Sequence, residues 1–238
     1  MLKKNIKVVE GSGFLAKKFK KHSFFLNKQN VIIYAAGVSN SQEKNATELQ
    51  REIRRFKTFS KQNNKKIVYI STYSIFDKSR NRNKYIKNKV KIELLIKKNL
   101  PSYLIVRLPE IVGFNKNPNT LINFFYQKII NRKKFTVWSN TKRNLLDVDD
   151  AIKIIIYFIK IYENKNKTLN LLNKKFYKPL RIVRFLENMT NIKGDYKILK
   201  KKTSIFKITN SINSKIINKL KLKFDSFYLN KTLKKYYK

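Results

Sequence analysis

The 238-residue chain contains no cysteine, one histidine, 5 glycines and 4 prolines. The lack of cysteine excludes disulfides and thiolate metal sites, and no other pattern predicts a metal centre. Acidic residues are also few, 14 against 56 lysines and arginines, which gives a formal net charge of +42. A field of that strength attracts nucleic acid or anionic membrane whatever the fold. The basic residues are spread along the whole chain, however, whereas nucleic-acid modules usually concentrate them in a patch.

Long apolar runs are absent as well. The most apolar stretch, residues 151–162, is interrupted by Lys153 and Lys160 and is too short to cross a bilayer, so we expect an amphipathic helix and no membrane insertion. The first residues lead into an apolar run without a signal-peptide pattern, which favours a cytoplasmic protein. Lys, Asn, Ile, Phe and Tyr are abundant, a skew that a strongly A+T-rich genome produces. We therefore attribute the charge to composition and expect only non-specific binding of nucleic acid.

Two of the scarce glycines stand together near the N-terminus. Residues 11–16 read Gly-Ser-Gly-Phe-Leu-Ala and directly follow the apolar run at residues 6–9. The pattern G-x-G-x-x-G/A between a strand and a helix is typical of dinucleotide binding, because it combines a tight turn with close approach of the backbone to a pyrophosphate. We predict cofactor contacts from Gly11, Gly13, Phe14 and Leu15. The simpler alternative is a strand, turn and helix with no ligand.

Tyr85 and Lys89 are the most informative pair in the chain. A Tyr and a Lys four residues apart share one face of a helix, where an ammonium lowers the pKa of the phenol, about 10 when unperturbed. Thr72 follows a strand-like run, and its hydroxyl can orient a substrate oxygen. These groups suit an alcohol–ketone interconversion, which also needs a hydride carrier. The alternative for Tyr85 and Lys89 is a solvated helix face in a Lys-rich chain.

Short apolar runs rich in β-branched residues alternate with helical patterns. Strands are predicted at residues 6–9, 31–34, 67–71 and 103–106, with helices at residues 46–61 and 88–98. This alternation predicts an α/β fold, a Rossmann-like parallel sheet with helices on both faces. We expect residues 1–113 with 143–172 to form the dinucleotide-binding domain. Residues 114–142 with 173–238 are expected to form a small C-terminal substrate-capping lobe, with helices at 121–131 and 181–189 and a strand at 135–138.

Five segments, taken in order, resemble the extended branch of the short-chain dehydrogenase/reductase superfamily, the NAD-dependent epimerase/dehydratase family that modifies nucleotide sugars. They are the Gly11 loop; Val31-Ile-Ile-Tyr-Ala35-Ala36-Gly37; Ser71-Thr72 with Tyr85 and Lys89; Val106-Arg-Leu-Pro109-Glu-Ile-Val-Gly113; and Arg143-Asn-Leu-Leu-Asp147-Val-Asp149-Asp150. In the fifth segment Asp147 stands where the family has a histidine. Residues 221–228 and Leu233 also resemble the last helix of the family's small domain.

The resemblance implies a role for each matched residue. Thr72, Tyr85 and Lys89 are the catalytic positions, and Lys89 also binds the nicotinamide ribose. The other implied cofactor contacts are Ala35, Ala36, Gly37 and Pro109, and the implied substrate contacts are Thr72, Tyr73 and Arg143. The implied partners are NAD or NADP and a nucleotide-sugar substrate. A homodimer stays open because many relatives dimerise through the helix that carries the Tyr and the Lys, although charge repulsion opposes it.

The stretch between Gly13 and Ala35 departs from the family in two ways. It is shorter than the family's interval, which holds two further strands, and only residues 24–26 suggest a strand here. It also lacks the acid that a dinucleotide fold places about 20 residues after the glycines, since the first acid after Gly11 is Glu43. Either the ribose carries a phosphate bound by Lys28 or its neighbours, which means NADP, or adenosine is held loosely, or the cofactor site is vestigial.

Several absences narrow the reaction that the resemblance implies. Relatives that remove water carry an acidic pair where this chain has Tyr73 and Ser74, and relatives that epimerise next to a ketone use a Cys or His pair. We therefore expect an NAD(P)-dependent oxidoreductase or epimerase that reduces a keto sugar, or epimerises through a transient ketone, with Tyr85 as acid/base. The alternative is a nucleic-acid-binding or non-catalytic interaction protein on a dehydrogenase-like scaffold. Asp149 or Asp150 is expected to cap the helix at residues 151–162.

Overall fold

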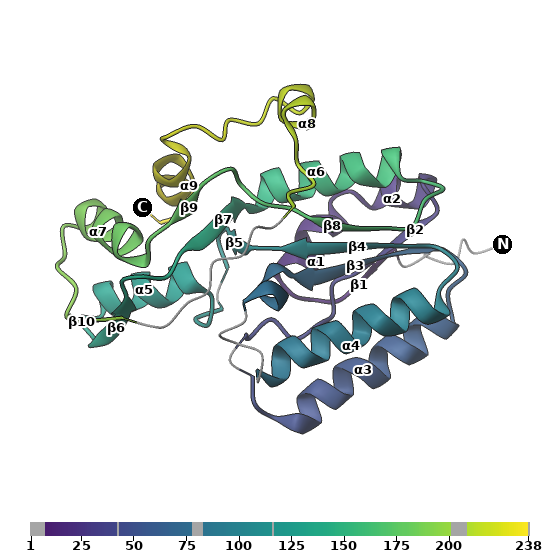
Figure 1. The fold of residues 1–238 in the computed structure, drawn as a ribbon, viewed down its shortest axis with the longest axis horizontal. Coiled ribbons are helices and arrows are strands. Elements are labelled where there is room, and N and C mark those ends of the chain that lie inside the picture. The colour runs from purple at the N-terminus through teal and green to yellow at the C-terminus, as the bar shows by residue number, and fades with distance from the viewer. Residues whose placement is uncertain (1–7, 42, 78–82, 116, 201–208, 238) are drawn as a thin grey trace. The chain divides into compact units, whose positions relative to one another are not determined.

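The computed structural model describes residues 8–41, 43–77, 83–115, 117–200 and 209–237 (Figure 1). The chain divides into two compact units. The first comprises residues 1–75, 80–108 and 152–170, and the second comprises residues 76–79, 109–151 and 171–238. Residues 76–79, 109–113, 143–151 and 171–172, which we expected in the first domain, fall in the second unit. The reason is that β5 (Glu110–Val112) pairs with β7 (Arg143–Asp147) there.

The first unit is built on a five-stranded sheet in which every pairing is parallel. Its strands, in order across the sheet, are β1 (Val9–Glu10), β2 (Val31–Tyr34), β3 (Lys66–Thr72), β4 (Tyr103–Leu108) and β8 (Lys167–Asn170). Helices α3 (Ala46–Lys61) and α4 (Lys84–Asn99) lie on one face, and α6 (Val148–Ile161) lies on the other (Figure 1). The predicted α/β class with helices on both faces is confirmed.

The connection from β1 to β2 consists of two short helices, α1 (Phe14–Lys20) and α2 (Ser23–Lys28). Residues 24–26, considered as a strand from the sequence, lie in α2, where Leu26 is fully buried. Strand order across the sheet therefore follows the order along the chain, with no reversal among the residues described. A dinucleotide-binding sheet consists of two mononucleotide-binding halves that meet where strand order reverses. The described strands contain no such reversal, so they lie on one side of that point.

An aromatic core fixes α3 and α4 against the sheet. Tyr34, Phe56 and Tyr69 are completely or almost completely buried, and the rings of Tyr34 and Phe56 meet edge to face with centroids 5.0 Å apart. Edge-to-face pairs of this kind stabilise a core beyond the area that they bury. Asn45 and Asn83 cap the two helices, because their side chains accept hydrogen bonds from the second or third helical N–H groups. The cap at Asn83 starts α4 four residues before the expected helix and brings Tyr85 into it.

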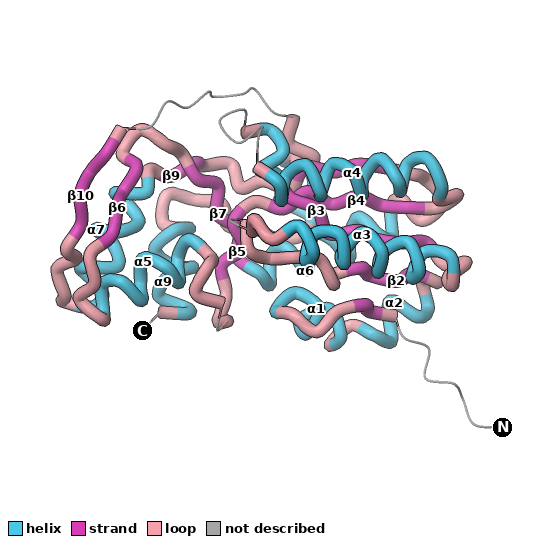
Figure 2. Tube along the Cα trace, turned by 90° about the horizontal axis from the view of Figure 1, so that it is seen from below, coloured by secondary structure: helices cyan, strands magenta, loops and turns pink. Residues whose placement is uncertain are grey.

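Within the described residues, the second unit contains two small sheets and four helices, besides the start of α6. β9 (Phe176–Tyr177) completes a three-stranded sheet with β5 and β7, and β6 (Phe135–Trp138) pairs with β10 (Tyr196–Leu199). The helices are α5 (Leu121–Ile130), α7 (Pro179–Thr190), α8 (Ser214–Lys219) and α9 (Tyr228–Tyr236). Helices α5, α7 and α9 and strand β6 all contribute side chains to the core of this unit, with α5 and α7 next to each other (Figure 2).

Most of the elements expected in the second unit are present. The helices predicted at 121–131 and 181–189 and the strand predicted at 135–138 correspond to α5, α7 and β6. The C-terminal motif differs, because α9 begins only at Tyr228, so residues 221–227 precede the helix. None of the helices within the described ranges is long and apolar enough to cross a membrane.

Candidate active site

The glycine loop forms a tight turn at the end of β1. Gly11 has a φ of +129°, and a Cβ atom on it would lie 2.6 Å from the carbonyl oxygen of Ala35, so only glycine fits. A Cβ atom on Gly13 would meet nothing within 4 Å. Ala16 is fully buried in α1. The predicted turn and helix are confirmed, and a strand precedes them at Val9–Glu10, while residues 6 and 7 of the predicted strand lie outside the described residues. The cofactor contacts of Gly11, Gly13, Phe14 and Leu15 stay predictions.

The turn after β2 lies directly beside the glycine turn. Glu10 pairs with Tyr34 in the sheet, and the Ala35 N–H donates to the Glu10 carbonyl at 2.8 Å. The second predicted cofactor segment, Ala35 to Gly37, is thereby adjacent to the first. Two segments that are distant along the chain meet at neighbouring strand ends because parallel strands place their carboxyl ends at the same edge of a sheet.

Tyr85 and Lys89 lie on the buried side of α4. Both side chains are buried, and the Lys89 Nζ atom is 5.5 Å from the centroid of the Tyr85 ring. The predicted shared helix face is therefore present, and the alternative of a solvated face is wrong for these residues. Thr72 ends β3, where its hydroxyl oxygen accepts a hydrogen bond from the Ser74 N–H at 3.1 Å. The Asn83 side chain also donates to the Ser41 carbonyl at 3.0 Å, which ties the loop after β2 to the start of α4.

Glu52 of α3 is the main residue that the sequence reasoning missed. Its carboxylate forms a buried ion pair with Lys89, with an Nζ–Oε1 distance of 2.7 Å and side-chain exposures of 1% and 4%. Asn88 donates to its other oxygen at 3.0 Å, as does the Val38 N–H at 3.1 Å. A signal was present in the sequence: Glu52 lies at helical spacing between Leu49 and Phe56, on the apolar face of α3, where a carboxylate needs a partner.

A second buried pair lies one turn further along α4. Glu93 accepts three hydrogen bonds from the Arg107 side chain: Nε donates to Oε1 at 3.0 Å and to Oε2 at 3.2 Å, and Nη2 donates to Oε2 at 2.5 Å. The Ser71 hydroxyl donates to the same carboxylate at 2.6 Å. Bidentate pairs of this kind hold a defined geometry. Arg107 and Glu93 therefore fix α4 to the ends of β3 and β4, next to Thr72.

The predicted contacts of Tyr73, Pro109 and Arg143 with substrate or cofactor come from outside β1, β2 and α4. Tyr73 opens the 3-10 turn that follows β3. Pro109 precedes β5 in the second unit, and Arg143 begins β7, where it pairs with Tyr177 of β9. The predicted roles of Tyr73, Pro109 and Arg143 stay predictions. Of the predicted site residues, the first unit brings together Gly11 with Ala35, and Tyr85 with Lys89 and Gly37.

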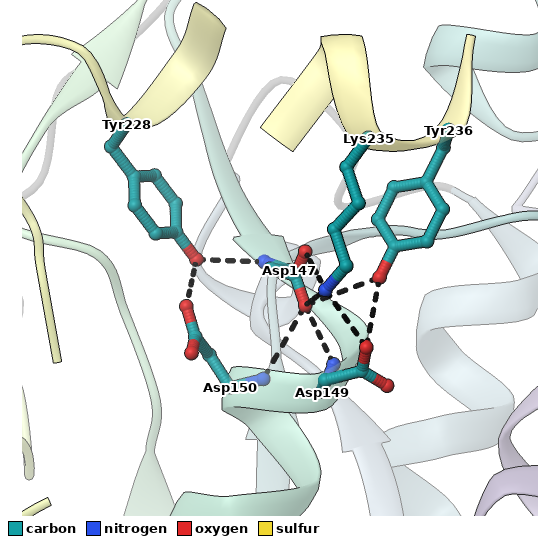
Figure 3. Close-up of polar contacts among 6 residues, drawn as sticks. All are labelled: Asp147, Asp149, Asp150, Tyr228, Lys235 and Tyr236. Atoms are coloured by element: carbon teal, nitrogen blue, oxygen red, sulfur yellow. Dashed lines mark hydrogen bonds and ion pairs between the residues drawn. The ribbon is translucent and has the colours of Figure 1, made fainter. Parts of the chain in front are cut away.

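Asp147, which replaces the family's histidine, caps α6 (Figure 3). Its Oδ1 atom accepts from the Asp149 N–H at 2.7 Å and from the Asp150 N–H at 3.4 Å. Because α6 begins at Val148, these are the N–H groups that an N-cap side chain satisfies. The expectation that Asp149 or Asp150 caps this helix is therefore wrong, since both lie inside its first turn.

The same three carboxylates anchor α9 (Figure 3). Lys235 contacts Asp147 at 3.1 Å and Asp149 at 2.8 Å, and the Tyr228 hydroxyl donates to Asp150 at 2.8 Å while accepting from the Asp147 N–H at 2.9 Å. Burial and the adjacent Asp150 carboxylate raise the pKa of Tyr228. Burial alone lowers the pKa of Lys235, but its hydrogen bonds to Asp149, Tyr236 and Asp147 outweigh burial and raise it. These contacts hold α9 against the start of α6. In the part of the chain described, no group of three or more His, Cys, Asp or Glu side chains could hold a metal ion.

Comparisons with known proteins agree with this architecture. A family model described as the NAD dependent epimerase/dehydratase family matches residues 17–171. No curated protein matches the sequence. Among solved structures, the UDP-glucuronic acid 4-epimerase from Bacillus cereus, in complex with UDP-glucuronic acid and NAD, is 18% identical with a TM-score of 0.66. That match covers 95% of this chain and 87% of the epimerase.

Two further solved structures show the same fold. The UDP-N-acetylglucosamine 4-epimerase from Bacillus cereus is 17% identical with a TM-score of 0.65, over 95% of this chain and 93% of that one. RMD from Pseudomonas aeruginosa, complexed with NADPH, is 13% identical with a TM-score of 0.66, and the match covers 94% of this chain and 95% of RMD. The family match spans well over half of the chain, although it begins after the glycine turn. The chain therefore belongs to the NAD dependent epimerase/dehydratase family, as the resemblance of its motifs predicted.

Proposed function

We propose that the protein is an NAD(P)-dependent enzyme that acts on a nucleotide-linked sugar, by reducing a keto group or by epimerisation through a transient ketone. The observation that carries the proposal is the placement of Lys89 5.5 Å from the Tyr85 ring, on a helix packed against the strand that ends in Thr72. Membership of the NAD dependent epimerase/dehydratase family supports it. So do the nucleotide sugars named with the solved structures of similar fold.

The proposed mechanism assigns one role to each of three side chains. In reduction, the Tyr85 hydroxyl donates its proton to the carbonyl oxygen, and the Thr72 hydroxyl hydrogen-bonds that oxygen. The Lys89 ammonium stabilises the phenolate that remains, because opposite charges attract strongly in a buried site. Bound NAD(P)H supplies the hydride. In epimerisation, Tyr85 first takes the proton from the sugar hydroxyl while oxidised cofactor would accept the hydride. Tyr85 returns the proton once the hydride has been given back to the other face of the ketone.

The residues present fit one half of a dinucleotide better than the other. Gly13 leaves open space where a backbone can approach a phosphate, and the turn from Ala35 to Gly37 beside it carries small side chains. The sheet, in contrast, has no described strand beyond β1 to support an adenosine. We therefore expect the nicotinamide half to provide most of the binding and the adenosine half to provide little.

The test is a titration of the protein with NADH and NADPH, followed by nicotinamide fluorescence, with ADP at matched salt as the reference for phosphate binding. We expect saturable binding tighter than ADP, weakened at least about tenfold by Lys89→Met. Lys87→Met is the matched control, because it removes the same charge from the exposed side of α4. The proposal would be wrong if NADH and NADPH bound no more tightly than ADP, or if Lys89→Met and Lys87→Met lost the same affinity for them.

Turnover is then measured with UDP-glucuronic acid, UDP-N-acetylglucosamine and a UDP-4-keto sugar as probes. Tyr85→Phe is expected to keep NADH binding and to lose at least about a hundredfold in rate, since general acid–base groups typically contribute that much. A Tyr85→Phe variant with unchanged turnover would remove Tyr85 from the mechanism. Binding of RNA that exceeds binding of NADH and survives moderate salt would favour the nucleic-acid alternative.

A further inference from the structure

Glu52 is a buried carboxylate whose contacts converge on the catalytic helix. Its Oε1 atom accepts from Lys89 Nζ at 2.7 Å and faces the Tyr69 hydroxyl at 3.5 Å. Its Oε2 atom accepts from Asn88 at 3.0 Å and from the Val38 N–H at 3.1 Å. One side chain of α3 thus joins β3, α4 and the turn after β2, and each of its oxygens has a protein partner.

The Lys89 ammonium is held against the backbone of that turn. A methyl group on Gly37 would overlap both the Lys89 ammonium and the Glu52 carboxylate. A side chain at this position would force the ammonium or the carboxylate to shift. Gly37, predicted from the resemblance as a cofactor contact, therefore has a role in this structure that needs no cofactor: it makes space for the pair.

The pair changes the electrostatic effect of Lys89 on Tyr85. An ammonium close to a phenol favours the phenolate, but a carboxylate 2.7 Å from that ammonium cancels much of its field. Among the described residues, Tyr34 of β2 and Glu93 of α4 also act on Tyr69 of β3 beside this cluster, and Arg55 and Glu10 act on Tyr34. Glu93 is itself paired with Arg107 of β4, so Glu52 is the carboxylate bound to Lys89.

We propose that Glu52 is a positioning residue that clamps Lys89 to the turn after β2 and, through its negative charge, keeps Tyr85 in the protonated, proton-donating form. This inference rests on the proposed function, and it favours ketone reduction, in which Tyr85 gives its proton to the substrate oxygen and regains one from solvent. Buried ion pairs seldom stabilise a fold beyond what apolar residues achieve, so a role in the reaction accounts better for this pair than stability does.

The test measures the pKa of Tyr85 directly, in the free protein. Tyrosine labelled with 13C at the ζ carbon is incorporated, the Tyr85 signal is assigned by its loss in Tyr85→Phe, and the protein is titrated from about pH 6 to about pH 10.5 by NMR. Glu52→Gln is expected to lower the Tyr85 pKa by about one to two units, because the Lys89 ammonium then acts on Tyr85 without the opposing charge of Glu52. Glu93→Gln is the matched control and is expected to move it by less than about half a unit.

A Tyr85 pKa that is the same in Glu52→Gln and wild type, or that moves as far in Glu93→Gln, would overturn the inference. If Glu52→Gln does not fold, two other variants carry the test. Glu52→Asp keeps the charge and should leave the Tyr85 pKa within about half a unit of wild type, whereas Lys89→Met should raise it by about one unit or more. A shift in Glu52→Asp as large as one unit, or none in Lys89→Met, overturns the inference.

The NMR titration needs neither cofactor nor substrate, so its outcome separates the two claims. Lost NADH binding together with the expected Tyr85 shift would reject the proposed function and keep the coupling between Glu52 and Tyr85. Normal NADH binding without a shift of the Tyr85 pKa would keep the proposed function and reject the coupling between Glu52 and Tyr85.

Discussion

The two units each contain a lysine held by carboxylates, and the two clusters differ in burial. In the first unit, Lys89 and Glu52 are 4% and 1% exposed. In the second unit, Lys235 is 46% exposed, while its partner Asp147 is 6% exposed. The chemistry of the contacts is the same, an ammonium against a carboxylate at 2.7 Å and 3.1 Å.

Burial decides what each cluster can do. When one partner of a buried pair is removed, the other is left as an uncompensated charge without water, which is strongly destabilising. Around Lys235, water replaces a lost partner at little cost. The Glu52 cluster therefore constrains its neighbours tightly, while the Asp147 cluster serves mainly to hold α9 against the start of α6.

The largest effect is expected when the buried cluster loses its carboxylate. Glu52→Ala should lower the free energy of unfolding by about 3–5 kcal/mol, because Lys89 stays buried without a partner. Urea unfolding followed by circular dichroism measures this change. The matched control is Glu48→Ala on the same helix, whose pair with Arg51 is exposed and should contribute less than about 1 kcal/mol. Equal losses in the two variants would contradict the role given to burial.

Removal of the buried carboxylate in the second unit should have a smaller effect. Asp147→Ala removes an N-cap and one partner of Lys235, so we expect a loss of about 2 kcal/mol, most of it from the cap. Asp147→Asn separates the two contributions, since its side-chain oxygen can still cap α6 without the charge, and should lose less than about half as much. If Asp147→Asn is as damaging as Asp147→Ala, the ion pair with Lys235 outweighs the cap.

Alkaline pH should weaken the second unit more than the first. In the second unit, hydrogen bonds with carboxylates raise the pKa of Lys235. Burial raises the pKa of five tyrosines there: Tyr177, Tyr196, Tyr228, Tyr236 and Tyr237. A group whose pKa is higher in the folded than in the unfolded chain stabilises the fold below its unfolded pKa, which is about 10 for these groups. Above that pH this contribution to the free energy of unfolding falls by about 1.4 kcal/mol per pH unit for each such group, until the pH reaches the folded pKa. In the first unit, burial raises the pKa of Tyr34 and Tyr69 but lowers that of Lys66, which acts in the opposite direction.

The single tryptophan provides the measurement for this prediction. Trp138 lies in β6 of the second unit, so its fluorescence reports that unit, whereas circular dichroism reports the whole chain. Above about pH 10 the urea midpoint seen by fluorescence should fall faster than the midpoint seen by circular dichroism. Tyr228→Phe should reduce this fall, because it removes one of the titrating groups. Midpoints that fall together would show that the two units lose stability equally.

The smallest effect is expected at Lys235. Lys235→Met should lower the free energy of unfolding by about 1 kcal/mol or less, because the ammonium is nearly half exposed and its attraction to the two carboxylates is screened. Urea unfolding at low and high salt measures it, and wild type should approach the variant as salt rises. A loss above about 2 kcal/mol would place this pair in the same class as Lys89 and Glu52.

Short-range features were predictable because they depend on neighbouring residues. The strand, glycine turn and helix at Gly11 follow from local backbone preferences, and the shared face of Tyr85 and Lys89 follows from helix spacing. Residues 24–26 were harder, because a short apolar run suits a strand or a buried helix equally, and packing of Leu26 against the sheet decided it. The cap on α6 was assigned to the wrong aspartate because a helix start uncertain by three residues moves the N-cap from Asp150 to Asp147.

By itself, the amino-acid sequence determined the alternation of strands and helices, the family and the three candidate catalytic residues, since each rests on a local pattern or on the order of motifs. Only the tertiary structure decided what Lys89 contacts. Its partner Glu52 lies 37 positions away, on another helix, and no local pattern joins them. Which charges share a low-dielectric interior depends on the packing of α3 against α4 and β3, and that packing sets how strongly each charge acts on Tyr85.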